Sequence, residues 1–106
     1  MNNKNNIWQR ILDYSTNNSK RPTDKSLIFS TKTGIEFWIQ RIDDKTILPV
    51  NTKGSKLFRI SRDVVQDDIE NNRGGNSNLK TDDFGTPAPA YRYALLNDPR
   101  IWLKNK

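Results

Sequence analysis

The sequence predicts an α+β fold, with a four-stranded antiparallel meander sheet, an N-terminal helix before it and two C-terminal helices after it. Apolar residues recur at helical spacing near the start of the chain, alternate with polar ones over residues 26 to 60, and return to helical spacing afterwards. Turn-forming residues separate the alternating segments, which favours a meander. At 106 residues the chain is expected to form one domain, with residues 1 to 5 and 104 to 106 loose.

The first helix is predicted over residues 7 to 15, with Asn5 or Asn6 as its cap. The stretch STNNSKRP should end it, because asparagine and serine favour turns and Pro22 restricts Arg21. One face of this helix carries an apolar stripe made of Ile7, Trp8, Ile11 and Leu12.

Four apolar segments follow: SLIFSTK, IEFWIQRI, TILPV and KLFRI. Thr33-Gly34, residues 43 to 45 and residues 51 to 55 lie between them, and each is rich in residues that tolerate tight turns. Because Pro49 cannot donate a hydrogen bond to a neighbouring strand, the third segment should be short, bulged or at an edge.

After the sheet, Ser61 is placed to cap a second helix, and Asp63 in its first turn suits the helix dipole. Gly74-Gly75 should end this helix. Residues 74 to 89 lack periodicity and read as a long loop. A third helix should begin near Pro89, with Tyr91 and Leu95 in the core and Tyr93 on the helix flank with its hydroxyl in water. The last residues could form a strand or an extended arm.

The predicted core takes one face of the sheet and the inner faces of the helices. Its expected members are Ile7, Ile11, Leu12, Phe29, Phe37, Ile39, Phe58, Ile60, Val65, Ile69 and Leu95.

The chain is basic, with a net charge of +6 and a pI of about 9.8, and its mean hydropathy is −0.89. Residues 1 to 62 carry a net charge of +7, whereas residues 63 to 98 carry −4. Cysteine and histidine are both absent, which excludes disulfides and thiolate chemistry and makes zinc sites and histidine general bases untenable. We expect no cofactor. The sequence shows neither an apolar signal segment nor a membrane span, so a cytoplasmic protein is expected.

Trp38 raises the main functional question, because strand alternation separates it from Ile35, Phe37 and Ile39. If helices cover only one face of the sheet, its indole stands exposed, and an unpaired base could stack on it. Two other interpretations remain open: the chain itself covers this face, or a second subunit or partner does.

Basic residues give a second candidate surface. Converging lysines and arginines can neutralise phosphates, whereas scattered ones only solvate a surface. The candidate binding residues, for nucleic acid or for a protein partner, are Trp38, Gln40, Arg41, Lys53, Lys56, Arg59 and Arg62.

A third set is acidic. Asp63 and Asp67 lie one helical turn apart and could hold a magnesium ion, as nuclease carboxylates do. No strand carries the Asp/Glu-x-Lys pattern of many nucleases, and the simpler interpretation is a solvated helix face formed by Asp63, Asp67, Asp68 and Glu70.

These patterns favour a small non-catalytic interaction module that binds a protein partner or itself, for example as a homodimer through the face bearing Trp38. The alternative is a nucleic-acid-binding protein that uses the basic residues with Trp38; a metal-dependent nuclease is a more distant one. In a general way the short chain resembles the uncharacterised cargo proteins of bacterial mobile elements, a resemblance to which no particular residues contribute.

Overall fold

An antiparallel sheet forms the centre of the fold. The computed structural model describes residues 7–52, 58–76 and 78–102. Within these residues the sheet has four strands in the order β1 (Phe29–Ser30), β2 (Glu36–Asp43), β3 (Thr46–Asn51) and β4 (Ile60–Ser61). Each strand pairs antiparallel with the next, which confirms the predicted meander.

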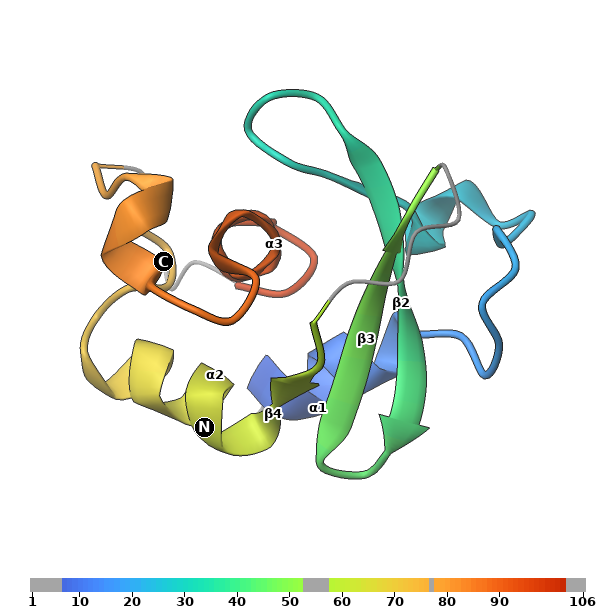
Figure 1. The fold of residues 1–106 in the computed structure, drawn as a ribbon, viewed down its shortest axis with the longest axis horizontal. Helices are drawn as coiled ribbons and strands as arrows, with labels where there is room; N and C mark the ends of the chain where they lie inside the picture. Colours follow the sequence, from blue (N-terminus) through green and yellow to red (C-terminus); the bar gives the residue numbers. More distant parts are fainter. Residues whose placement is uncertain (1–6, 53–57, 77, 103–106) are drawn as a thin grey trace.

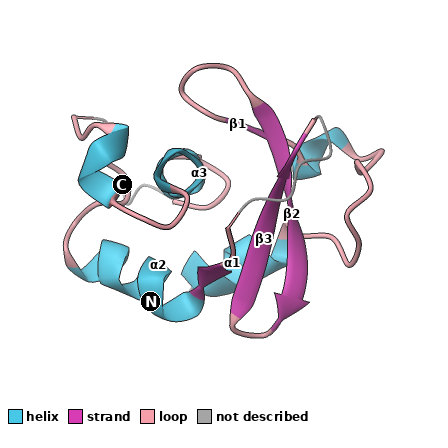
Figure 2. Cartoon of the chain, in the orientation of Figure 1, coloured by secondary structure: helices cyan, strands magenta, loops and turns pink. Residues whose placement is uncertain are grey.

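Both faces of the sheet are covered. Helices α1 (Ile7–Asp13), α2 (Arg62–Glu70) and α3 (Pro89–Leu96) pack on one face, in the predicted order (Figures 1 and 2). On the other side, residues 14–28, with the short 3-10 helix η2 (Lys25–Leu27), run past β2 (Figure 1). Thr16 pairs with Gln40 at the edge of β2, so this segment is tied to the sheet.

The helix starts follow local sequence signals. The Ser61 hydroxyl accepts a hydrogen bond from the Val64 backbone N–H at 3.2 Å, which confirms Ser61 as the cap of α2. Asp63 lies in the first turn of α2, as predicted. The proposed cap of α1 at Asn5 or Asn6 lies outside the described residues.

Pro49 lies at a position of β3 that β4 does not reach, so among the described residues its outer side borders an edge of the sheet, which was one of the predicted alternatives. It is buried in β3, opposite Ile39 of β2. The Ile39 carbonyl accepts from the Thr16 N–H at 2.7 Å on the far side of β2, so the Ile39–Pro49 pair is one in which neither residue bonds across to the other. The missing N–H of Pro49 therefore costs the β2–β3 ladder nothing, and β4 pairs only with Thr46 and Ile47.

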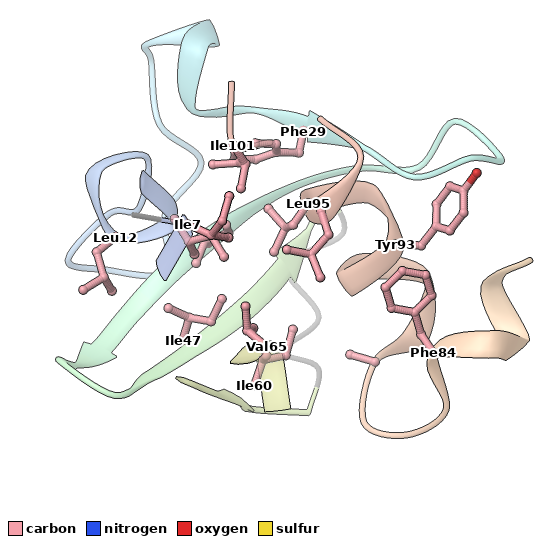
Figure 3. Packing of buried hydrophobic residues seen from close by; sticks show 14 of the residues in the cluster. Ile7, Leu12, Phe29, Ile47, Ile60, Val65, Phe84, Tyr93, Leu95 and Ile101 are labelled. Carbon is pink, nitrogen blue, oxygen red and sulfur yellow. The ribbon is translucent and has the colours of Figure 1, made fainter. Parts of the chain in front are cut away.

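The hydrophobic core lies between the helices and the sheet and contains all but one of the predicted residues (Figure 3). The exception is Phe58, which is 75% exposed, because β4 begins only at Ile60 and strand alternation does not extend back to residue 58. Ile35 precedes β2 and is 45% exposed. Tyr93 is buried rather than wet, since its ring packs edge-on against Phe84 at 5.7 Å.

The C-terminal third differs most from expectation. Helix α2 ends at Glu70, with Asn71 as its C-cap, before the Gly74-Gly75 pair. The two glycines lie under the Trp102 ring, so close that a Cβ on either would come within 2.1 Å of it. The predicted loop contains the 3-10 helix η3 (Thr81–Phe84), and the final described residues form a turn in which the Ile101 and Trp102 N–H groups bond to the Asp98 carbonyl, rather than a strand or an arm.

Candidate functional site

Trp38 is not an exposed platform. Its side chain is 3% exposed, and its indole N–H donates to the Ser19 carbonyl at 3.2 Å. The Arg21 guanidinium lies 5.8 Å from the centre of the ring. The stacking prediction is therefore wrong for this protomer, because residues 14–28 cover the second face of the sheet.

Gln40 and Arg41, the neighbouring candidates, are only partly exposed. Gln40 follows Trp38 on the same face, and its partner across the ladder is the buried Leu48. Arg41 forms an ion pair with Asp44 in the turn after β2. Neither side chain is a free group on an open surface.

The basic candidates lie away from Trp38. Trp38 is opposite Val50, whereas Ser61, the cap of α2, is opposite Thr46, four residues or about 13 Å along β3. Arg59 and Arg62 flank β4 and are exposed, and they pair with no carboxylate of the described residues. Lys53 and Lys56 lie outside the described residues. The described part of the chain thus does not bring the predicted set together.

The acidic residues of α2 divide into two groups. Asp63, Asp67 and Glu70 are exposed, as the solvated-face interpretation predicts, but Asp68 is 0% exposed. Among the described residues no group of three or more acidic side chains is arranged to hold a metal ion. The nuclease alternative therefore gains no site from this helix.

Asp68 is buried against Arg92 of α3, which is 2% exposed. The Arg92 Nε and Nη2 atoms donate to the two carboxylate oxygens at 2.8 and 2.6 Å. Arg73 also donates to Asp68, at 3.2 Å, and to Asp67, whose hydrogen bond is the main cause that raises the pKa of Arg73. The pair joins α2 to α3 in the interior.

Arg92 also holds the loop that leads into α3. Its Nη1 donates to the Gly85 and Pro87 carbonyls at 3.0 and 2.8 Å, and its Nη2 donates to the Phe84 carbonyl at 2.7 Å. With the two bonds to Asp68, every N–H of the guanidinium has an acceptor. Residues 84–88 are consequently fixed in one conformation, in which Gly85 and Ala88 have positive φ angles of 65° and 52°.

This loop forms one side of an apolar hollow of about 230 Å³. The described residues that line it are uncharged: Phe58, Thr86, Ala88, Pro89, Ala90 and Tyr91. Phe58 provides the opposite side and leaves three quarters of its side chain in solvent. The Phe37 ring packs edge-on against the Tyr91 ring, with 4.8 Å between the two ring centres. An exposed aromatic beside a rigid apolar depression is the usual form of a contact surface.

A larger depression of about 440 Å³ lies at the end of the sheet between the β1–β2 turn and the end of β3. Ser30, Glu36 and Thr52 give it a polar lining beside Ile35. The Glu36 carboxylate pairs with Arg21 at 3.1 Å, so its charge is already balanced. This depression is a weaker candidate than the Phe58 hollow.

Sequence reasoning missed both the hollow and the buried ion pair. A signal for the pair existed, because Asp68 shares its helical stripe with Val65 and Ile69. Arg92 likewise lies one turn before the buried Leu95 and Leu96. No local pattern distinguishes Phe58 from a core residue, since it alternates correctly with Ile60.

Comparisons with known proteins add no assignment: no family model, no curated protein and no solved structure matches this chain. Among the described residues, none of the helices has the length and apolar character needed to cross a bilayer.

Proposed function

We propose that this chain is a small non-catalytic interaction module, acting in the cytoplasm, that binds a protein partner through the Phe58 hollow. The observation that carries the proposal is the 75% exposure of Phe58 beside described lining residues that are all uncharged. Binding there would remove apolar surface from water, which stabilises a complex by roughly 25 cal/mol per Å² before the costs of association.

The loop side of the hollow supports this role because hydrogen bonds and a ring contact hold it in place. Arg92 fixes the loop side through three carbonyls, and Phe37 supports Tyr91 from the core. A surface that keeps its shape without the partner loses little conformational entropy on binding. Aromatic side chains such as Phe58 and Tyr91 are also enriched where interfaces concentrate their binding energy.

The nucleic-acid alternative is less well supported by the arrangement of side chains. It required an exposed ring near converging cations, but Trp38 is covered and lies about 13 Å along β3 from the residues near β4. Phe58 does stand beside Arg59, yet its neighbours in the hollow are apolar rather than phosphate-binding groups.

The proposal is tested by titrating the ¹⁵N-labelled protein with N-acetyl-phenylalanine amide, a blocked apolar side chain. We expect saturable chemical-shift changes in the amides of residues 86 to 91. Phe58→Ala should weaken them, whereas Ile35→Ala should not, because Ile35 is the other exposed large apolar residue of the described chain and lines the other depression. Shifts that never saturate, or that appear equally around Ile35, would count against the hollow as a binding surface.

A further inference from the structure

The surface around the Phe58 hollow is unevenly charged. Arg59 follows Phe58 on one side, is exposed and forms no ion pair with the described residues. On the other side η3 carries Asp82 and Asp83, which are both exposed. Lys80 precedes them and balances one of the two carboxylates, so the net charge of that side is −1. The Asp82 carbonyl accepts from the Gly85 N–H at 3.2 Å, so these acids are directly joined to the loop that lines the hollow.

The segments that carry these charges lie on either side of the loop that lines the hollow. In Figure 1 the loop entering α3 separates the start of β4 from η3, drawn in orange, and Figure 3 shows the same order from another direction. Phe58 and Thr86 both line the hollow, so the segment that continues into Arg59 and the segment that follows η3 meet at one depression.

A twofold axis through such a patch exchanges its two sides. In a symmetric dimer each surface meets a copy of itself, so a positive side facing a negative side makes the surface self-complementary. Arg59 of one copy would then face Asp82 of the other, while each Phe58 would pack against the second copy's apolar lining. A partner with one uniform charge would oppose like charges on one of the two sides.

From this arrangement we propose that the occupant of the hollow is a second copy of this chain, bound as a symmetric dimer. The inference rests on the proposed function, since it requires the hollow to be a contact surface. The hollow is small, so the interface belongs to the weak, transient class, with a dissociation constant between about 1 μM and 1 mM.

Sedimentation velocity over that concentration range tests the dimer. The wild-type protein should show a reversible monomer–dimer equilibrium. Phe58→Ala should raise the dissociation constant about 30-fold or more, as expected for a central aromatic residue, while Ile35→Ala should leave it unchanged. Phe58 is 75% exposed and Ile35 is 45% exposed, so Phe58→Ala should leave the urea midpoint of unfolding almost unchanged and Ile35→Ala should lower it only slightly. A monomer at every concentration, a dimer unaffected by Phe58→Ala, or association that continues beyond the dimer would each overturn the inference.

A charge exchange tests the predicted orientation. Arg59→Glu alone and Asp82→Lys alone should each raise the dissociation constant about tenfold, because each places like charges opposite one another in both symmetric contacts. The two changes combined should restore it to within about threefold of the wild type. If the combined variant binds no better than the single ones, the proposed symmetric contact is wrong.

The same variants separate this inference from the proposed function. Arg59→Glu keeps the lining of the hollow intact, so as a monomer it should still bind N-acetyl-phenylalanine amide. If the wild type is monomeric and the amide still binds at residues 86 to 91, the second copy is excluded but the contact surface stands. If Arg59→Glu shows no saturable binding of the amide, the proposed function itself fails.

Discussion

Trp38 is buried by residues 14–28, and it bonds to Ser19, which lies 19 residues before it in the chain. The Ser19 carbonyl accepts its indole N–H, and Arg21 packs over its ring. Burial of this kind gives the large indole a structural role on the second face of the sheet.

Truncating Trp38 should therefore destabilise the protein. We expect Trp38→Ala to lower the free energy of unfolding by about 3–5 kcal/mol, because the change leaves a cavity and an unpaired Ser19 carbonyl. Urea denaturation followed by circular dichroism measures this. Phe58→Ala is the matched control and should cost about 0.5 kcal/mol or less, since that ring is exposed. Equal losses in the two variants would contradict the assignment of one ring to the interior and the other to the surface.

The contrast between Trp38 and Phe58 shows why sequence could predict the sheet but not its surface. Alternation in IEFWIQRI correctly separates the two faces of β2, with Phe37 and Ile39 in the core and Trp38 on the other face. It cannot reveal that residues 14–28 fold back over one face, or that β4 is only two residues long and leaves Phe58 outside it. Both features depend on tertiary contacts, which local periodicity does not encode.

Asp24 has a small, separate effect on stability as the pH changes. Its carboxylate accepts from the Ser26 hydroxyl at 2.7 Å and from the Ser26 N–H at 2.9 Å. The hydroxyl bond is the larger cause, and together they lower the pKa of Asp24 below its ordinary value of 3.8. Because the folded-state pKa is depressed, the stabilisation is present above pH 3.8 and is lost as the pH falls through the lower folded-state pKa.

Ser26→Ala should move the pKa of Asp24 back toward its ordinary value. The backbone N–H of residue 26 remains, so the shift should be reduced rather than abolished. Carboxyl-detected NMR titration measures the pKa in both proteins. An unchanged pKa in the variant would show that the hydroxyl bond does not cause the shift.

Helices α2 and α3 depend on one buried ion pair and on the loop attached to it. Arg92 satisfies Asp68 and three loop carbonyls, so its removal would leave the carboxylate with only the Arg73 bond and would leave several backbone acceptors without donors. A buried pair is weak evidence of net stability, but breaking one side of it is costly.

We expect Arg92→Met to lower the free energy of unfolding by about 3–5 kcal/mol, because it leaves the buried Asp68 carboxylate with only the bond from Arg73. Adding Asp68→Leu should recover part of this loss by removing that charge. The recovery should be incomplete, since the Phe84, Gly85 and Pro87 carbonyls still lack Arg92. Chemical denaturation of the single and double variants measures these changes in the free energy of unfolding. A double variant less stable than Arg92→Met would show that the stranded charge is not the main cost.

At the scale of the molecule, the predicted fold class and the predicted order of helices and strands are confirmed. Both follow from local residue spacing and from helix caps, as Ser61 shows for α2. The candidate site was poorly predicted for a different reason. It depends on Arg92, a charged residue whose interior position is made possible by Asp68, 24 residues away. A basic residue between two tyrosines carries no local sign of such a partner.

Arg100 connects the C-terminal turn to the segment that covers the second face of the sheet. Its guanidinium pairs with Asp98 at 2.8 Å and donates to the Ser26 and Ile28 carbonyls at 2.6 and 3.0 Å. The same group lies 4.2 Å from the centre of the Phe29 ring. Since Ser26 and Ile28 belong to the segment that also covers Trp38, the two sides of the sheet are linked through this one side chain.

Arg100→Met should consequently weaken the attachment of residues 14–28 to the second face of the sheet, while the hydrophobic core stays intact. We expect a loss of roughly 1.5–3 kcal/mol in the free energy of unfolding, the usual range for hydrogen bonds to a charged group. The Trp38 indole N–H should also exchange with solvent faster, because its cover opens more often. Arg100→Lys is the matched control: it keeps the charge but cannot make the forked contacts, so it should restore only part of both quantities. Faster exchange confined to the C-terminal turn, with the Trp38 N–H unchanged, would mean that the two faces are not coupled through Arg100.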